Sequence, residues 1–557
     1  MGGKILIKSI NIIQYRKLKN LDLEFLNRLN AISGTNGTCK TSLLHLIGNS
    51  LQAPTKKCGK IINEKCLPII KAVNSVTNPK VESLTRGDTK YNDPAYGLKG
   101  HLFSVDYYND YPTLEFRRHN ASNQSRYSVK PKYKKGTEDS LPYCPVIYLG
   151  LSRLLPYGEF QNDEALAGIK KILPIAYQDE IAEIYRKFTN YQITYKSTQQ
   201  MGDIKIRSEF YSDIEGIDSN TISAGEDNLY IILTALVSLK YYFQSINSAN
   251  DSEVESVLLI DELDATLHPA FQIKLLNLFR EMSSLYKIQI VFTTHSMSLL
   301  EEMLDKKDNV VYLYDNISSV VQMHDLDIYK IKMHLNSLTS ENIYADKVIP
   351  VFTEDEEART LLEIIFDYFS ETKQGFANAR RFFHFVKANI GAENLTNIFS
   401  DDKILHTTIR SICILDGDKN YEMSNCVISL PGGQAPEKLL IDYAEKLLDE
   451  DDHFWVEKAI IERGYGKHYY IEHIQQKVIE FEEKLSKCKE SGDSTKGLTR
   501  QFNKDLFANN KTFFKLLFKH WLNNQFNKAV IDKFYNNLKA LFKKVCHYHE
   551  INPNEWN

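Results

Sequence analysis

Eight residues near the N-terminus have the types and the order that bind phosphate. The stretch 34–41 reads Gly-Thr-Asn-Gly-Thr-Cys-Lys-Thr, follows the apolar run 29–33 and precedes a segment of helical period that begins at Ser42. A strand, a glycine-containing loop and a helix in this order form a P-loop, in which the helix N-terminus faces the phosphates. The predicted nucleotide-binding residues of this loop are Gly34, Thr35, Asn36, Gly37, Thr38, Cys39, Lys40 and Thr41.

The residue types in this loop have separate chemical tasks. Gly34 and Gly37 let backbone N–H groups curl around the phosphates. Lys40 is expected to reach the β- and γ-phosphates of ATP, and the Thr41 hydroxyl is the predicted ligand for Mg²⁺. Cys39 departs from the pattern, which has glycine before the lysine. Because its side chain would crowd the loop beside the nucleotide, we expect binding to survive and the rate of hydrolysis to change.

A second group of candidate residues stands where two apolar strands end. Asp261 and Glu262 follow the run 257–260, and His295 follows the strand predicted for 289–294. Asp261 is predicted to hold the metal, directly or through water, and Glu262 to polarise the attacking water. A strand-end histidine alone is more commonly structural, but in this order His295 is predicted to contact the γ-phosphate.

A serine and a glycine open the helix predicted for 230–243. The sequence 223–226 is Ser-Ala-Gly-Glu. Ser223 is a typical N-cap and Gly225 allows close backbone approach, so free N–H groups are predicted to face an anion. We assign Ser223, Gly225 and Glu226 to the nucleotide site, although an ordinary capped helix has the same residues.

One arginine follows another buried-looking strand. Residues 144–149 are apolar and lead into Gly-Leu-Ser-Arg, which ends at Arg153. This arginine is predicted to face either phosphate or a partner, and an arginine exposed on the surface fits the pattern equally well.

Composition limits the class of protein. The 557 residues predict two to four domains, and 43% of them are apolar, which is ample for sizeable cores. The net charge of −4 does not indicate binding to nucleic acid or membrane, so any basic patch must be local. The eight cysteines lack zinc-ligand spacing and are predicted to be reduced thiols. Because no signal pattern and no apolar run of about 18 residues occurs, we expect a soluble, cytoplasmic protein.

Pattern and composition predict three regions in an α/β protein. Residues 1–325 form a P-loop head with a polar insertion, 52–139, that has no helical period and contains one hairpin, 101–118. A second α/β module covers 346–445, and 446–557 form a helical C-terminal region.

The last 58 residues, 500–557, are basic and aromatic. They contain ten lysines and arginines against four acids, interleaved with phenylalanine, tryptophan and tyrosine. Apolar residues at helical spacing favour amphipathic core helices with lysine on the solvent side. A surface for nucleic acid or for a partner protein is the alternative.

Four elements in this order resemble the ABC-type ATPase heads of the RecF, SMC and OLD group. They are 34–41, 223–226, 260–262 and 294–295, and the resemblance covers 1–325. It implies an ABC-type P-loop fold with ATP and Mg²⁺ as cofactors. In that family the Ser-x-Gly-Glu signature of one head caps the γ-phosphate held by the P-loop of another. One P-loop and one signature in this chain thus imply a homodimer or higher oligomer through facing heads.

Residues 346–445 resemble a reduced Toprim module, as in OLD nucleases. In a working module of this kind, Glu354, Asp416 and Asp418 would bind Mg²⁺ and cut phosphodiesters. Asp355 stands where the family pattern has glycine. The alternative is that these acids are solvated strand ends of a structural module. The three predicted strands of the module are 348–352, 411–415 and 426–430.

The whole arrangement is similar to PtuA-type ATPases of Septu antiphage systems, which also occur beside retrons. The resemblance implies a regulatory ATPase that controls a separate HNH nuclease of the PtuB kind. For a retron-associated member it further implies a reverse transcriptase and its RNA/DNA hybrid as partners. No H-N-H cluster occurs in this sequence to supply that activity. Two alternatives remain: a self-contained OLD-family Mg²⁺-dependent nuclease, and a RecF- or SMC-like DNA-repair ATPase.

Overall fold

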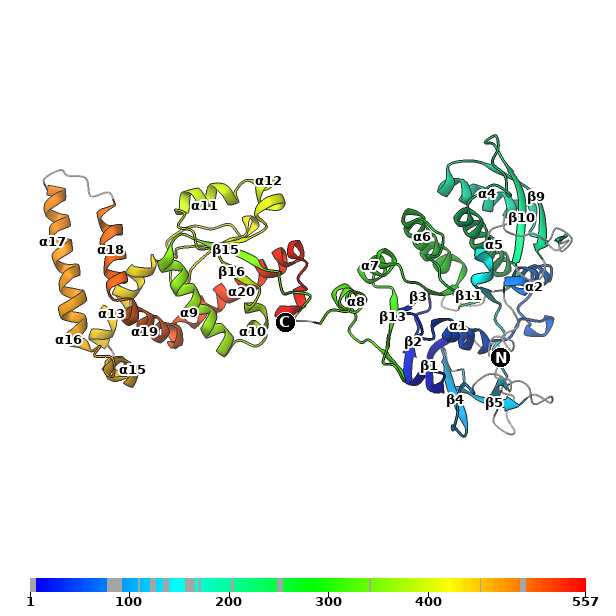
Figure 1. Ribbon diagram of the computed structural model, residues 1–557, viewed down its shortest axis with the longest axis horizontal. Helices are drawn as coiled ribbons and strands as arrows, with labels where there is room; N and C mark the ends of the chain where they lie inside the picture. The colour runs from blue at the N-terminus through cyan, green and yellow to red at the C-terminus, as the bar shows by residue number, and fades with distance from the viewer. Residues whose placement is uncertain are drawn as a thin grey trace. The chain divides into compact units, whose positions relative to one another are not determined.

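The computed structural model divides the chain into two units, Met1–Leu335 and Asn336–Asn557, each with its own main sheet (Figure 1). The two units are described separately below. The structure describes residues 7–77, 93–108, 111–120, 127–133, 140–155, 166–168, 172–201, 205–247, 254–339, 342–450, 452–490 and 497–557.

Parallel strands form the centre of the N-terminal unit. β3 (Leu29–Gly34), β12 (Ile288–Thr293) and β11 (Ser256–Ile260) are buried at every position, as expected for parallel strands covered on both faces. They pair in the order β3, β12, β11, with β13 (Asn309–Asp315) beyond β3 and β7 (Val146–Leu149) beyond β11. The carboxyl ends of these strands therefore meet at one edge of the sheet.

An antiparallel group extends this sheet on the β13 side. The strand order is β6-β5-β4-β1-β2-β14-β13-β3-β12-β11-β7. β2 alternates between buried and exposed residues, as a strand with one solvated face does. A small separate sheet has the order β10-β9-β8. The remaining strands are β1 (Ile7–Tyr15), β2 (Leu18–Glu24), β4 (His101–Tyr107), β5 (Leu114–Asn120), β6 (Tyr127–Lys132), β8 (Leu166–Gly168), β9 (Ile193–Met201), β10 (Lys205–Ser212) and β14 (Val320–Gln322).

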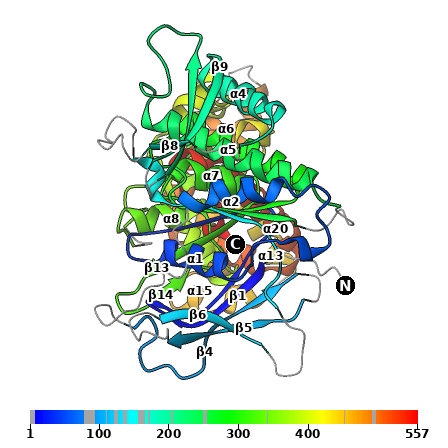
Figure 2. The ribbon, with the colours of Figure 1, turned by 90° about the vertical axis from the view of Figure 1, so that its right-hand side faces the viewer.

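Helices cover both faces of the parallel strands (Figure 2). α1 (Lys40–Asn49) packs its leucines in one apolar cluster with Ile32 and Leu259, whereas α5 (Ala224–Gln244) and α6 (Pro269–Tyr286) pack in the cluster that contains Ala31. Alternate residues of one strand thus face opposite layers. The other helices of this unit are α2 (Cys66–Thr77), α4 (Ile175–Thr189), α7 (Met297–Asp305) and α8 (Ile328–Leu335).

The structure of the predicted insertion 52–139 agrees with the sequence analysis in its hairpin and differs from it in a helix. Its hairpin is confirmed, because β4 pairs with β5 in antiparallel register. The absence of a helix was wrong: Cys66–Thr77 forms α2, whose apolar side packs against the head. The parts of the insertion at 78–92, 109–110, 121–126 and 134–139 lie outside the described residues.

The described strands of the C-terminal unit are all parallel. Their order is β16-β15-β17-β18, with β15 (Ile349–Thr353), β16 (Phe383–Phe385), β17 (Ile412–Leu415) and β18 (Val427–Ser429). The ends of β15 and β17 lie side by side, so the acids that follow them come together.

Helices of the tail pack back onto this sheet. α20 (Lys528–Val545) contacts β17 and β18, and α19 (Lys511–Asn523) contacts α9 (Glu356–Thr372). The other helices are α10 (Phe376–Arg380), α11 (Ala392–Phe399), α12 (Asp402–Ile404), α13 (Pro436–Glu450), α14 (Asp452–Val456), α15 (Lys458–Ile461), α16 (Lys467–Tyr470), α17 (Gln476–Glu490) and α18 (Leu498–Asn509).

Aromatic residues fill the core of the C-terminal unit. Trp556 is fully buried, packs on Phe376 and Phe542, and donates a hydrogen bond to the Tyr535 hydroxyl at 2.9 Å. The other two tryptophans of the sequence, at 455 and 521, are also buried in this unit. The expectation of amphipathic core helices in the tail is thus confirmed, except at Phe526, which is 91% exposed.

The predicted fold class is confirmed: an α/β P-loop ATPase head of the ABC type is followed by an α/β module with a helical tail. All eight cysteines are free thiols, also as predicted. Within the described part of the chain, no helix has both the length and the apolar composition that crossing a membrane requires.

Candidate functional site

The phosphate-binding loop begins at a glycine that the sheet itself requires. Gly34 ends β3 with φ 141°, and a Cβ there would lie 2.2 Å from the carbonyl oxygen of Leu313 on the next strand. Gly37 has φ 83°, in the left-handed region that glycine adopts without strain. Both predicted glycines therefore have a backbone reason to be glycine.

Cys39 occupies the same left-handed region without being glycine. Its φ is 63°, and it stands at the N-cap of α1 without a side-chain cap. Such a conformation costs a non-glycine residue about 1–2 kcal/mol. The unusual residue of the loop thus introduces strain at the start of the helix that faces the phosphates.

The Lys40 side chain is held within the loop that precedes it. Lys40 Nζ donates hydrogen bonds to the carbonyl oxygens of Gly34 (3.0 Å) and Thr35 (2.9 Å), so the ammonium lies within the loop. Burial lowers the pKa of Lys40, against the raising effect of the charges of Glu262 and Asp261. The lysine and the strand-end acids therefore share one electrostatic site.

Asp261 is the centre of a hydrogen-bond network that joins the start of α1 to the ends of β11 and β12. Its carboxylate accepts a bond from the Thr41 hydroxyl at 2.8 Å and from the Thr293 hydroxyl at 2.7 Å. Thr293 Oγ1 in turn accepts the N–H of Glu262 at 2.7 Å. Asp261 is 1% exposed, so its charge is satisfied by neighbours rather than by bulk water. Thr293, which sequence reasoning did not single out, positions both acids.

Glu262 has a strained backbone and is fixed on both sides. Its φ is 50°, which is uncommon for a residue with a side chain. Its N–H is held by Thr293, and its carbonyl accepts the Arg153 guanidinium at 2.9 Å. Backbone strain of this kind at a strand end is typical of functional sites.

His295 lies at the same edge of the sheet. Its backbone N–H donates to both carboxylate oxygens of Asp264, at 3.2 and 3.3 Å. Burial and the positive charge of Lys40 lower the pKa of His295, and the charges of Asp264 and Glu262 oppose this. The histidine predicted from its strand end is therefore an electrostatic neighbour of the P-loop lysine.

Ser223 and Glu226 form a reciprocal cap at the start of α5. The Ser223 hydroxyl accepts the N–H of Glu226 at 3.3 Å, and the Glu226 carboxylate accepts the N–H of Ser223 at 3.0 Å. Tyr191 donates to the other oxygen of Glu226 at 3.1 Å. The predicted N-cap is confirmed. A Cβ on Gly225 would lie 2.4 Å from the carbonyl oxygen of Thr266, which excludes any larger residue without a backbone shift.

Arg153 is a buried residue, so the alternative of an arginine exposed on the surface was wrong. Its side chain is 1% exposed, and burial lowers its pKa to about 10, which leaves it charged at neutral pH. The signal available in the sequence was an arginine four residues after a buried strand. The pattern did not reveal that the side chain turns back beneath the strand ends.

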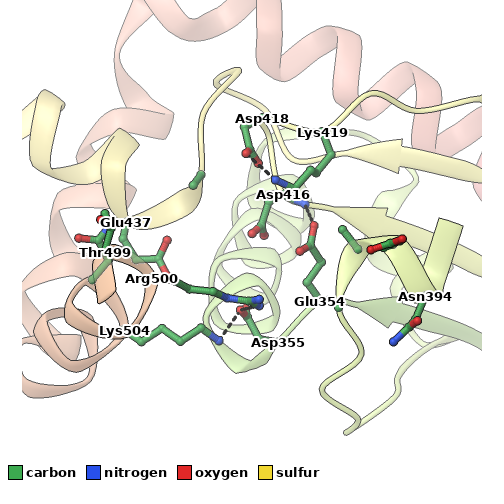
Figure 3. Close-up of a pocket in the computed structure, with 15 residues that line it drawn as sticks. Glu354, Asp355, Asn394, Asp416, Asp418, Lys419, Glu437, Thr499, Arg500 and Lys504 are labelled. Carbon is green, nitrogen blue, oxygen red and sulfur yellow. Dashed lines mark hydrogen bonds and ion pairs between the residues drawn. The ribbon is translucent and has the colours of Figure 1, made fainter. Parts of the chain in front are cut away.

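In the C-terminal unit the three predicted acids line one pocket of about 590 Å³ (Figure 3). Glu354 Oε1 accepts the N–H of Asp416 at 3.0 Å, which joins the ends of β15 and β17. Asp418 pairs with Lys419 at 2.6 Å. Burial raises the pKa of Asp416 to about 8, and the nearby charge of Glu354 adds to this. One carboxylate oxygen of Asp416 is buried without a hydrogen-bond partner.

Asp355, the residue in the place of a glycine, is bound from the tail. It caps α9 by accepting the N–H of Ala358 at 3.1 Å, and Lys504 of α18 donates to it at 2.7 Å (Figure 3). Although burial acts to raise it, the pKa of Asp355 is lowered by Lys504. Arg500 lies 3.8 Å from the same carboxylate. Two basic side chains of the tail thus face this side of the pocket.

Among the described residues, no group of three or more histidine, cysteine, aspartate or glutamate side chains is arranged to hold a metal ion. The three acids of the pocket share a wall without converging as a ligand set. Their assignment to Mg²⁺ stays a prediction, as does that of Thr41 and Asp261.

Comparison with known proteins identifies an ATPase domain within the head. A family model described as "AAA domain, putative AbiEii toxin, Type IV TA system" matches residues 177–301. This span contains the Ser223 cap, the two acids after β11 and His295. The Septu protein PtuA of Bacillus thuringiensis is 36% identical over 73 residues, which are 13% of this chain and 18% of that protein. The chain thus spans less than a fifth of the length of this curated relative.

Two solved structures are similar to part of the chain. An SMC head bound to the C-winged helix domain of ScpA has a TM-score of 0.34 and 14% identity, over 58% of this chain and 99% of that one. A RecF–ATP structure has a TM-score of 0.31 and 14% identity, over 57% of this chain and 99% of that one. The family model begins after the P-loop, and together with the geometry of that loop it supports an ATPase of the AAA or ABC kind in the head.

Proposed function

We propose that this protein is the ATP-hydrolysing regulatory subunit of a bacterial antiphage complex, and that its paired heads control a separate HNH nuclease of the PtuB kind. The observation that carries the ATPase part is the hydrogen bond between Thr41 and Asp261, which joins the P-loop to the acid-ended strand. The antiphage part draws its support from the resemblance to PtuA over 73 residues. A reverse transcriptase with its RNA/DNA hybrid is a further proposed partner for a retron-associated form.

The residues of the head fit ATP and Mg²⁺. Lys40 lies inside a loop in which Gly34 and Gly37 adopt positive φ, a conformation that lets backbone N–H groups curl around phosphate. The oxygens of Thr41 and Asp261 are ligands that Mg²⁺ accepts. Bound MgATP supplies the phosphoanhydride bond that is cleaved and the charge neutralisation of its phosphates. The Glu262 carboxylate orients a water molecule and takes its proton, and His295 binds a phosphate oxygen. Asp261 keeps the Thr41 hydroxyl in place.

The proposed dimer follows from the division of the site residues. The reciprocal cap occupies the N–H groups of Ser223 and Glu226, so the N–H groups of Ala224 and Gly225 are the ones proposed to meet an anion. In the proposed closed state this signature meets the nucleotide held by the P-loop of a second copy. ATP would then act as the contact between two heads, and hydrolysis would release it.

Sedimentation with and without ATP tests the dimer. We expect the wild-type chain to form a larger species with ATP, and Lys40→Ala and Gly225→Ala to prevent it for different reasons. Lys40→Ala removes nucleotide binding, whereas Gly225→Ala retains it and alters the signature turn. Glu281→Gln, at an exposed position of α6, is the control. Full ATPase activity in a nucleotide-bound monomer would contradict the proposal.

Reconstitution with an HNH nuclease of the PtuB kind tests the regulatory role. Nuclease activity of the complex should respond to ATP and to Lys40→Ala, while the purified chain alone should not cut nucleic acid. Cleavage by the HNH protein that is the same with and without this chain would contradict the proposed regulation.

A self-contained Mg²⁺-dependent nuclease is the second candidate function. The observation in its favour is that Glu354, Asp416 and Asp418 line one pocket at the ends of two parallel strands. Metal-dependent cutting by the purified chain that is lost in Asp416→Ala and retained in Lys40→Ala would establish this activity. Absence of cutting by the wild-type chain with Mg²⁺ or Mn²⁺ would leave the regulatory role as the better account.

A further inference from the structure

A buried arginine joins segments of the head that are far apart in the sequence. Arg153 Nε donates to Asn228 Oδ1 on α5 at 2.9 Å, and Nη2 donates to the Glu262 carbonyl at 2.9 Å. Nη1 is held by the carbonyl oxygens of Leu149 (3.2 Å) and Gly150 (2.9 Å) at the end of β7. A buried guanidinium with several oxygen acceptors is held in one orientation, since its donors form a rigid planar fork.

Asn228 extends this contact to the loop after Glu262. Its Nδ2 donates to the Ala265 carbonyl at 3.0 Å and lies 3.3 Å from the Thr266 hydroxyl. One turn earlier on the same helix, Gly225 is packed against the Thr266 carbonyl so closely that a Cβ would lie 2.4 Å from it. The start of α5 and the loop 262–266 are therefore in direct contact at Asn228 and at Gly225, and they are also joined through Arg153.

We propose that Arg153 is a positioning residue that couples the signature turn at Ser223 to the orientation of Glu262. The inference rests on the proposed head dimer, in which the signature turn meets the nucleotide of the partner. A shift of α5 on that contact would act through Asn228 and Arg153 on the peptide of Glu262. Each head would then hydrolyse its own ATP at a rate set by the nucleotide on the opposite head.

The strained backbone of Glu262 is the reason why such coupling has a large effect. Glu262 stays at φ 50° only while its neighbours hold it, and Arg153 holds its carbonyl while Thr293 holds its N–H. A displacement of a catalytic group by about 1 Å can lower a rate by roughly a hundredfold. A positioning contact on this peptide therefore controls turnover without touching the nucleotide.

Three variants separate this role from simple packing. Arg153→Lys keeps the positive charge and loses the planar fork. Asn228→Asp keeps an oxygen for Arg153 Nε and loses the N–H that donates to Ala265. Arg280→Lys is the matched control, because Arg280 is a partly buried arginine of α6 that bonds Asp308 at 2.8 Å.

The experiment combines backbone amide hydrogen exchange of the nucleotide-free chain with ATPase kinetics. We expect amide exchange to rise in both 223–228 and 262–266 in Arg153→Lys. In Asn228→Asp it should rise in 262–266. In Arg280→Lys it should change in neither segment. The value of kcat should fall by roughly ten- to a hundredfold in the first two variants. KM for ATP should change less than twofold, and the Hill coefficient should move towards 1.

The outcomes separate the inference from the proposed function. Unchanged exchange in both segments of Arg153→Lys would overturn the coupling contact, whether or not the protein hydrolyses ATP. Raised exchange with unchanged kcat would overturn the positioning role. A wild-type chain that does not hydrolyse ATP or dimerise would refute the proposed function, and exchange alone would then decide whether Arg153 links the two segments.

Discussion

Two buried parallel strands of this chain end in a pair of acids, and the two pairs have different surroundings. At the end of β11, Asp261 accepts hydrogen bonds from two threonine hydroxyls that other segments supply. At the end of β17, one carboxylate oxygen of Asp416 has no hydrogen-bond partner, and burial raises the pKa of Asp416 to about 8. The difference shows that other segments of the fold decide whether an acid at a strand end has hydrogen-bond donors.

The largest expected effect concerns the acid beside Asp261. In Glu262→Gln the side chain can no longer take a proton from water, so kcat should fall by about 10²–10⁴-fold. Nucleotide affinity should change little, because Lys40, Thr41 and Asp261 remain, and the ATP-bound form should accumulate. Single-turnover hydrolysis and nucleotide retention measure this, with Glu281→Gln as the control. Unchanged hydrolysis would show that the end of β11 is no more catalytic than the end of β17.

The next prediction concerns stability at the end of β17. Asp416 has a folded pKa of about 8, above its unfolded value of 3.8, so its destabilising effect grows as pH rises through that interval. Asp416→Asn should raise the free energy of unfolding of the C-terminal unit by about 1–3 kcal/mol at pH 8 and by much less at pH 4.5. Chemical denaturation across pH measures this.

Asp418→Asn is the matched control, because Asp418 is exposed and paired with Lys419. Addition of Mg²⁺ sharpens the comparison. A metal bound by these acids would stabilise the wild-type unit at pH 8 and not the Asp416→Asn variant. Equal stability of both variants at all pH values would contradict the raised pKa.

A smaller effect is expected from making Asp261 resemble Asp416. Thr293→Val removes the hydroxyl that donates to Asp261 and accepts from the N–H of Glu262. The free energy of unfolding should fall by about 1–2 kcal/mol, because two buried groups lose a partner. The Mg²⁺ concentration for half-maximal ATPase activity should rise. Thr189→Val is the control, since that hydroxyl bonds only a helix carbonyl in the bonds described. An unaltered Mg²⁺ requirement would exclude a role for Thr293 in holding Asp261.

The smallest effect is predicted for the loop itself. Cys39→Gly relieves the strain at φ 63° and should change stability by less than about 1 kcal/mol, because glycine also gains freedom in the unfolded chain. Turnover should change more than nucleotide affinity. Cys39→Ala separates the causes, since it removes the thiol and keeps the strain. Equal turnover in Cys39→Gly and Cys39→Ala would assign the effect to the thiol.

The sequence predicted these two strand ends almost to the residue. The strand expected at 411–415 is β17, Ile412–Leu415, and the apolar run before Asp261 is β11. These ends were predictable for a physical reason: a parallel strand covered on both faces must be apolar throughout, and it ends where polar residues begin. The Ser223 cap was predictable for a similar reason, since its hydrogen bonds lie within one helical turn.

Contacts between distant segments were less predictable. Thr293 and Arg153 position the acids through bonds to residues 31 and 109 positions away, and no local pattern encodes such a partner. The return of α20 onto β17 is another contact of this kind. α2 was missed although its residues are mostly apolar, because the interpretation of 52–139 rested on the polar residues around it. Sequence patterns therefore revealed the candidate site residues better than the residues that position them.

Every tryptophan of the sequence is buried in the C-terminal unit, so tryptophan fluorescence distinguishes this unit from the head. The three indoles, at 455, 521 and 556, are all shielded from water there, and the head contains only tyrosine and phenylalanine as ring fluorophores. Tryptophan emission therefore comes from the C-terminal unit alone. Any change in that emission when ATP is added to the head would be a direct optical record of communication between the two units.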